Sequence, residues 1–262
     1  MESIIYEKKD HVAYITFNRP EVHNALDNPA KRRMGEIWND FKNDPDIWLG
    51  VVTGAGGKAF STGSDIKEIL ADVRAESRTE RANLVVVEPL MEGKIEVYKP
   101  LIAAIAGWCI GGGMELALVC DIRIATQDAK FGLMEPKIGT IAESGGTIRL
   151  PNQIPYAVAM EMILTGDPIT AQRAYEVGLI NQVVPAFADL MPAARKMAER
   201  VLACAPLSVR VSKEQAWKSF NLPYAVGMSM NEIGREVIYG SNDFKEGFEA
   251  FVKKRPPRWT GK

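Results

Sequence analysis

The stretch GWCIGGGMELALVCD, residues 107–121, places three consecutive glycines directly before Met114 and Glu115, at the start of an apolar run. Glycine costs backbone entropy and packs poorly, so three glycines beside a core segment need a physical reason. A carboxylate that opens a buried helix needs one too, because buried charge is expensive. The pattern predicts a strand, a glycine turn and a helix whose free N–H groups and dipole attract an anionic or carbonyl oxygen. The alternative is a turn that serves only close helix packing.

The composition is that of an ordinary globular protein. The chain has 262 residues, 47% hydrophobic and 25% charged, with a formal net charge of −1, so no global field favours nucleic acid or an anionic membrane. The three cysteines, at positions 109, 120 and 204, lack paired metal-ligand spacing and fit a reducing compartment. The N-terminus lacks the apolar core of a signal peptide, and no apolar run approaches the ~18 residues of a membrane helix. We therefore expect a cytoplasmic protein with no membrane partner.

The order of predicted elements indicates an α/β core followed by helices. Alternating apolar residues predict a strand over 12–17, and the next helix should be capped by Asp27 or Asn28. Further strands are expected within residues 48–57, 100–107 and 122–126. After about residue 155 the strand signal nearly disappears, which predicts an α/β core over 1–190 and a helical C-terminal region over 191–262.

A second glycine turn precedes a predicted helix in GKAFSTGSDIKEI, residues 57–69. Gly63 and Ser64 lie where this strand-like segment ends, so the turn offers a second free backbone donor. Two N–H groups from separate strand-to-helix turns can form an oxyanion hole, which stabilises an enolate or a tetrahedral intermediate. Neither turn has the spacing of a phosphate-binding loop.

Three glutamates lie in apolar, glycine-bearing segments near these turns: Glu115, Glu135 and Glu143. Two carboxylates beside an oxyanion hole can divide acid and base work, provided that burial or hydrogen bonding separates their pKa values. The simpler roles are that Glu115 complements the helix dipole and that Glu143 caps a helix beginning at Ser144.

Five ordered motifs resemble the enoyl-CoA hydratase/isomerase (crotonase) family: RPEVHNAL, GKAFSTGSDIKE, AGWCIGGGMELALVCDIRIAT, KFGLMEPKIGTIAESGGTIRLP and LTGDPITAQRAYEVGLINQVV. The patterns PKIG and AESGG and the ending EGFEAFVKKRPPRW further resemble carnitinyl-CoA dehydratase-like members. The resemblance implies an α/β spiral of repeated β-β-α units with a helical C-terminal trimerisation region. It also implies an acyl-CoA thioester substrate, with no metal and no cofactor besides the coenzyme A of the substrate.

The resemblance also assigns roles to single residues. The backbone N–H groups of Ser64 and Gly112 would form the oxyanion hole. Glu115 stands where the family has the glutamate that activates water, and Glu135 stands where it has the glutamate that exchanges the proton at the α-carbon. The segments that match the lining of the coenzyme A site contain Val22, Thr62, Asp65, Ile66 and Lys67. Lys67 could instead be a solvated surface lysine.

Taken together, the sequence predicts a hydro-lyase that interconverts a 2-enoyl-CoA and a 3-hydroxyacyl-CoA. One alternative is an isomerase of the same family that uses Glu135 and Glu143 as proton carriers. An alternative of another class is an RNA-binding homologue, since residues 31–33 are basic, although we expect no nucleic-acid partner. The extra carboxylate at Glu143 predicts a small polar or functionalised acyl group, and residues 71–82 are expected to border its pocket. The family resemblance further implies a homotrimer, or a homohexamer made of two trimers.

Overall fold

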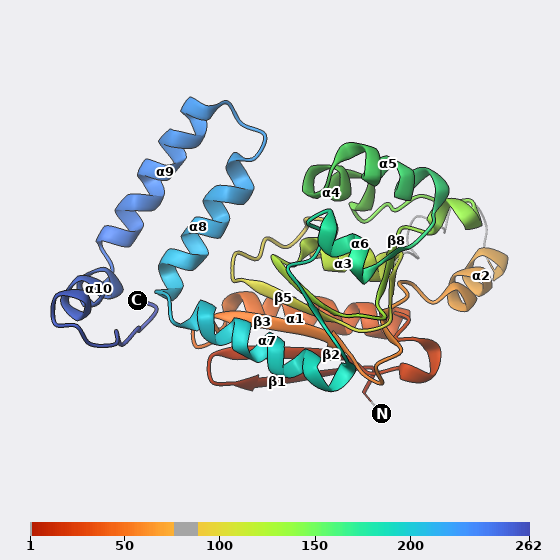
Figure 1. Ribbon diagram of the computed structural model, residues 1–262, viewed down its shortest axis with the longest axis horizontal. Coiled ribbons are helices and arrows are strands. Elements are labelled where there is room, and N and C mark those ends of the chain that lie inside the picture. Colours follow the sequence, from red (N-terminus) through yellow and green to blue (C-terminus); the bar gives the residue numbers. More distant parts are fainter. Residues whose placement is uncertain (1, 76–88) are drawn as a thin grey trace.

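The computed structural model in Figure 1 describes residues 2–75 and 89–262. Most of the segment 71–82 that we expected at the acyl pocket lies outside the described residues. The N-terminal elements follow the predictions closely: the strand β2 is Val12–Phe17, and the helix α1 is Asn28–Asn43. Asp27 is the N-cap of α1 and accepts a hydrogen bond from the Ala30 amide at 2.8 Å, a cap typically worth about 1 kcal/mol.

Two sheets organise the described chain. The strands of the larger sheet, in spatial order, are β1 (Ile4–Lys9), β2, β3 (Leu49–Gly54), β5 (Leu101–Ile105), β7 (Ile122–Thr126) and β10 (Gln182–Val184). The strands of the smaller sheet are β4 (Ala59–Ser61), β6 (Trp108–Ile110), β8 (Lys130–Gly132) and β9 (Ile169–Thr170). β10 was not predicted, because three residues between helices carry little periodicity.

Successive turns of the chain repeat one unit, which confirms the predicted α/β spiral. β3 lies in the larger sheet, β4 in the smaller one, and the helix α2 (Ile66–Ala75) follows. β5, β6 and the helix α3 (Gly112–Val119) repeat that order, and β7 and β8 begin it again. The pairs β3–β5, β5–β7, β4–β6 and β6–β8 are all parallel. Loops that follow neighbouring strands therefore meet at the same edge, which is where a site can be assembled.

The larger sheet is covered on both faces. One cluster of buried apolar residues includes Trp38 and Phe41 of α1, and a second joins the sheet to the helix α7 (Phe187–Leu202) through Leu190 and Ala194. The predicted boundary between residues 190 and 191 falls inside α7. Because α7 packs on β3, β5 and β7, it belongs to the core, and the protruding helical part begins after it.

The remaining helices form two groups (Figure 1). Beside the smaller sheet lie a short helix η3 (Glu135–Ile138), α4 (Gly146–Gln153), α5 (Tyr156–Thr165) and α6 (Ala171–Glu176). Beyond α7 the chain forms α8 (Pro206–Ser219), α9 (Tyr224–Tyr239) and α10 (Asn242–Val252). α8 and α9 pack on each other and extend away from the sheets, as the blue ribbons of Figure 1 show. The short η1 (Pro20–Val22) leads into α1.

Candidate active site

The two amides predicted for an oxyanion hole come together because β4 and β6 are neighbouring parallel strands. The loop after β4 carries Ser64, and the turn after β6 leads into α3 at Gly112. A Cβ atom placed on Gly112 would lie 3.2 Å from the Gly63 Cα and 3.7 Å from the Ser64 nitrogen. The two loops are therefore in contact, and a side chain at either glycine would compress them.

Both amides are available to a ligand. Gly112 is the first residue of α3, so its N–H group has no partner within the helix, and the helix dipole adds positive potential there. The chain beside Ser64 is fixed to Leu26, through the Gly63 carbonyl at 2.8 Å and the Asp65 amide at 3.0 Å. Within the described part of the chain, no hydrogen bond is donated by either the Ser64 or the Gly112 amide. This pair has the arrangement of an oxyanion hole.

The three consecutive glycines at 111–113 serve the turn and the packing together. Gly111 has φ 56° and ψ −132°, a conformation that is costly for any residue with a side chain. A Cβ on Gly113 would lie 2.1 Å from the Ser61 carbonyl oxygen, so α3 passes directly against the backbone of β4. The close-packing role is therefore present, and the same turn leaves the Gly112 amide at the start of α3 without a partner in the helix.

Glu115 lies in the first turn of α3 and is only 4% exposed. Its Oε1 accepts a hydrogen bond from the Gly146 amide at 3.0 Å. The pKa of Glu115 is raised to about 7: burial is the main cause and the charge of Glu135 adds to the rise, while the Gly146 amide and the charge of Arg149 oppose it. A carboxyl group with a pKa near neutrality suits acid–base catalysis at physiological pH.

Glu135 opens η3 and faces the same glycine turn. A Cβ placed on Gly111 would lie 3.4 Å from its Oε1. Burial raises the pKa of Glu135 as well. Its Oε2 is buried and has no hydrogen-bond partner among the residues that the structure describes, which leaves it able to bond a substrate or a water molecule. The structure thus brings Glu115, Glu135 and the two amides into one cluster.

Glu143 is placed differently from the other two glutamates. It is exposed, in the turn that precedes α4, and within the described residues it makes no hydrogen bond or ion pair that holds its side chain. α4 begins at Gly146 with Gly145 as N-cap and has no side-chain cap. The alternative that Glu143 caps a helix beginning at Ser144 is therefore wrong.

The predicted substrate-binding residues lie on two loops that contact each other. The Thr62 hydroxyl donates to the His23 carbonyl at 3.4 Å, one residue after the half-buried Val22. Ile66 and Lys67, at the start of α2, are exposed and accessible to a ligand.

The carboxylate of Asp65 has a structural task in this loop. It pairs with the Arg19 guanidinium at 3.3 Å and accepts from the Lys67 amide at 3.2 Å. The side chain is therefore occupied in holding the loop that carries Ser64, and the Asp65 amide is bonded to the Leu26 carbonyl.

Several supporting residues were missed by the sequence analysis. Asn24 is buried and donates to the Ala59 carbonyl at 2.7 Å. The Ser61 hydroxyl donates to the Asn24 carbonyl at 2.8 Å and accepts from the Gly63 amide at 3.1 Å. These bonds fix the loop of the Ser64 donor. Local sequence carries no signal for the two bonds between Asn24 and the β4 segment, because their partners are more than thirty residues apart.

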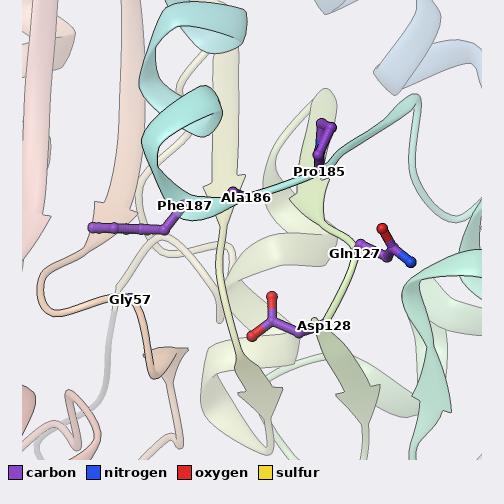
Figure 2. Close-up of a pocket in the computed structure, with 6 residues that line it drawn as sticks. All are labelled: Gly57, Gln127, Asp128, Pro185, Ala186 and Phe187. Carbon is purple, nitrogen blue, oxygen red and sulfur yellow. The ribbon is translucent and has the colours of Figure 1, made fainter.

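A separate cavity of about 440 Å³ lies at the carboxyl ends of β3, β7 and β10 (Figure 2). Figure 2 shows Phe187 reaching from α7 toward the turn of Gly57, with Gln127 and Asp128 on the loop after β7; the lining residues are Gly57, Gln127, Asp128, Pro185, Ala186 and Phe187. None of the predicted catalytic residues lines it. Its one carboxylate cannot divide acid and base work, so we place the chemistry in the glutamate–amide cluster.

Residues 2–75 and 89–262 contain neither a metal-ligand cluster nor a membrane-spanning helix. No group of three His, Cys, Asp or Glu side chains there is arranged to hold a metal ion. None of the helices in that part of the chain has the length and apolar character needed to span a membrane.

The basic stretch at residues 31–33 does not form an exposed basic face. Lys31 is buried, and Arg33 pairs with Glu36 at 2.9 Å. The structure therefore offers no support for the RNA-binding alternative.

Comparison with known proteins covers nearly the whole chain. Residues 7–262 match the family model described as enoyl-CoA hydratase/isomerase. The (E)-benzylidenesuccinyl-CoA hydratase of Thauera aromatica is 42% identical over 98% of this chain and 99% of its own. The carnitinyl-CoA dehydratase of Citrobacter koseri is 35% identical over 100% of this chain and 99% of its own.

A solved structure agrees with the sequence comparisons. The crystal structure of an enoyl-CoA hydratase from Mycobacterium marinum superimposes with a TM-score of 0.89 at 36% identity, over 99% of each chain. The family model, the relatives and the fold agree with one another. The chain therefore belongs to the enoyl-CoA hydratase/isomerase family.

Proposed function

We propose that the protein catalyses the reversible hydration of a 2-enoyl-CoA thioester at the cluster of Glu115, Glu135 and the Ser64 and Gly112 amides. The observation that carries this proposal is the pair of buried carboxylates beside two free amides. Its relatives named above are hydratases and dehydratases, so hydro-lyase chemistry is favoured over the isomerase alternative.

The geometry supports a division of labour between the carboxylates. Burial raises the pKa of both carboxyl groups, and the charge of Glu135 raises that of Glu115 further, so we treat the two groups as a coupled pair. In hydration, ionised Glu115 takes a proton from water as the oxygen bonds to C3. Protonated Glu135 gives its proton to C2. Dehydration reverses both transfers.

The two amides stabilise the charge that develops between these steps. When water adds at C3, the electron pair of the double bond moves toward C2 and the thioester oxygen, giving an enolate. The Ser64 and Gly112 N–H groups donate to that oxygen. Water and two proton carriers suffice for the reaction, so the mechanism requires no cofactor beyond the coenzyme A of the substrate.

The direct test is an absorbance assay on crotonyl-CoA, in which hydration removes the conjugated double bond. We expect a steady loss of absorbance that requires the enzyme. Failure to hydrate crotonyl-CoA, crotonobetainyl-CoA and (E)-benzylidenesuccinyl-CoA alike would contradict the proposal.

For the acyl group, we propose a small polar or functionalised chain rather than a long fatty one. The support is Glu143, an exposed carboxylate three residues before the Gly146 amide that holds Glu115. A long apolar chain that covered this carboxylate would leave it desolvated and unpaired, at a cost of several kcal/mol.

The acyl preference is tested by comparing crotonyl-CoA, decenoyl-CoA, crotonobetainyl-CoA and (E)-benzylidenesuccinyl-CoA. We expect kcat/KM for decenoyl-CoA to be the lowest in the wild type and to rise in Glu143→Gly. Glu143→Gln, which keeps the size and removes the charge, should raise it too. If decenoyl-CoA is the best wild-type substrate and Glu143→Gly leaves the order unchanged, the proposal is wrong.

We also propose that the chain assembles as a trimer, or as a hexamer of two trimers. Large apolar side chains are exposed along the protruding helices, among them Trp217, Phe220, Tyr224, Ile233 and Phe251. Large apolar side chains exposed on one group of helices are typical of a protein–protein interface. Sedimentation at micromolar concentration should give three or six times the mass of one chain, and a stable monomer would contradict this.

A further inference from the structure

Arg149 lies in α4, outside the carboxylate and amide groups to which chemistry has been assigned, yet it reaches back over the turn that supports Glu115. Its Nη1 donates to the Ser144 carbonyl at 2.8 Å, and its Nη2 donates to the Met91 carbonyl at 2.6 Å. The side chain is half-buried. One guanidinium therefore joins two segments that are far apart in the sequence.

The turn has been shaped around this side chain. Gly145 has φ 99°, and a Cβ placed there would lie 2.1 Å from the Arg149 Nη1. Only glycine accommodates both that φ value and that approach. The planar fork of a guanidinium suits two carbonyls in fixed directions, whereas a lysine offers one compact charge.

The same turn holds the catalytic carboxylate. The Gly146 amide donates to the Glu115 Oε1 at 3.0 Å, and a Cβ placed on Gly146 would lie 3.1 Å from the Glu115 Cγ. A displacement of the turn would therefore move both the donor and the wall against which Glu115 rests. Small displacements of such groups lower catalytic rates considerably.

We propose that Arg149 is a positioning residue, which clamps the Ser144–Gly146 turn to the Met91 carbonyl so that the Gly146 amide holds Glu115 in its reactive orientation. The inference rests on the proposed hydratase function. Arg149 acts through the turn and the charge it carries, not by contact with the reacting atoms.

The electrostatic surroundings of Glu115 support this role. The charged groups that act on it in the described part of the chain are Glu135 of η3, which raises its pKa, and Arg149 of α4, which lowers it. Removal of the Arg149 charge should therefore raise the pKa of Glu115 further. In hydration, where ionised Glu115 is the base, the acid limb of the kcat/KM profile should move to higher pH.

Two variants separate the effect of the planar guanidinium fork of Arg149 from the effect of its positive charge. Arg149→Lys keeps a positive charge and loses the fork, so kcat should fall roughly tenfold or more while the acid limb stays near that of the wild type. Arg149→Met loses both, so kcat should fall and the acid limb should move to higher pH than in Arg149→Lys. Arg173→Met is the matched control, because Arg173 is exposed on α6 and only pairs with Glu176 at 3.7 Å.

We would measure kcat and kcat/KM between pH 5 and 10 on the enoyl-CoA that the wild type hydrates. Circular dichroism confirms that each variant folds. If Arg149→Lys matches Arg173→Met in kcat, the positioning role is wrong, whether or not Arg149→Met folds. The carboxyl pKa is also read by infrared titration, with the Glu115 band assigned by its loss in Glu115→Gln. The infrared titration tests the inference about Arg149 even if the protein hydrates none of the substrates. Failure to hydrate any of them would contradict the proposed function but not the role of Arg149.

Discussion

Replacing Glu115 or Glu135 by glutamine should lower kcat for hydration by about 10²–10⁴-fold, the usual contribution of one general acid or base. Glutamine keeps the size of the side chain, and its Oε1 can still accept the Gly146 amide bond that Glu115 makes at 3.0 Å. The fold and the binding of a CoA ester should therefore persist. Steady-state kinetics and calorimetric binding of a non-reactive acyl-CoA separate the two effects. A variant that hydrates at the wild-type rate would show that its residue has another role.

The pH profile gives a second view of the same pair. In the proposed mechanism Glu115 is the base of hydration, and its pKa is raised to about 7, so kcat/KM should fall as the pH drops through about 7. The protons of Glu115 and Glu135 come off as those of a coupled pair. The apparent pKa values in the pH profile should therefore belong to the pair and not to either group alone.

The raised pKa of Glu115 also makes stability depend on pH. The folded-state value, about 7, lies above the ordinary 4.5, so the protonated form favours folding. That contribution is complete below pH 4.5 and is lost as the pH rises through 7. Glu115→Gln lacks this dependence, so its melting temperature relative to the wild type should increase between pH 5 and pH 8. This readout is independent of catalysis.

The fold was largely predictable from local patterns. β2 (Val12–Phe17) alternates over its full length, and Asp27 followed by Asn28 and Pro29 is a recognisable helix start. β10 carries too few residues for periodicity to register, and the place of α7 on the larger sheet depends on contacts between distant segments. The sequence shows the helical periodicity of α7, but it does not show the surface on which α7 packs.

The active site divides in the same way. Glycines before a helix indicate free amides, so Ser64 and Gly112 could be found from sequence and resemblance. The glycines of the turn at residues 144–146 can be seen in the sequence. The sequence does not show that the Gly146 amide bonds to Glu115, thirty-one residues earlier. The fork of Arg149 is likewise invisible, because an arginine in a helix carries no signal of its partners. Positioning groups depend on tertiary contacts, whereas the reacting groups have local signatures.

The oxyanion hole is best tested by removing one amide without removing a side chain. Gly112→Pro eliminates the N–H group that α3 presents at its first position, where proline is tolerated by a helix. The loss of one oxyanion donor is worth ~3–4 kcal/mol, so kcat should fall about 10²–10³-fold. Ser64→Ala, which keeps its amide, should be nearly silent.

Proline also adds side-chain atoms at position 112, so the control variant must add a side chain there while keeping the amide. Gly112→Ala keeps the amide and places a Cβ 3.2 Å from the Gly63 Cα, the same close contact that proline would make. The ratio of kcat between the alanine and proline variants therefore isolates the N–H group from the crowding of the two loops. Circular dichroism and thermal unfolding establish that both variants fold. A folded Gly112→Pro protein as active as Gly112→Ala would mean that the Gly112 amide does not bind the developing enolate oxygen, and the charge would have to be stabilised elsewhere.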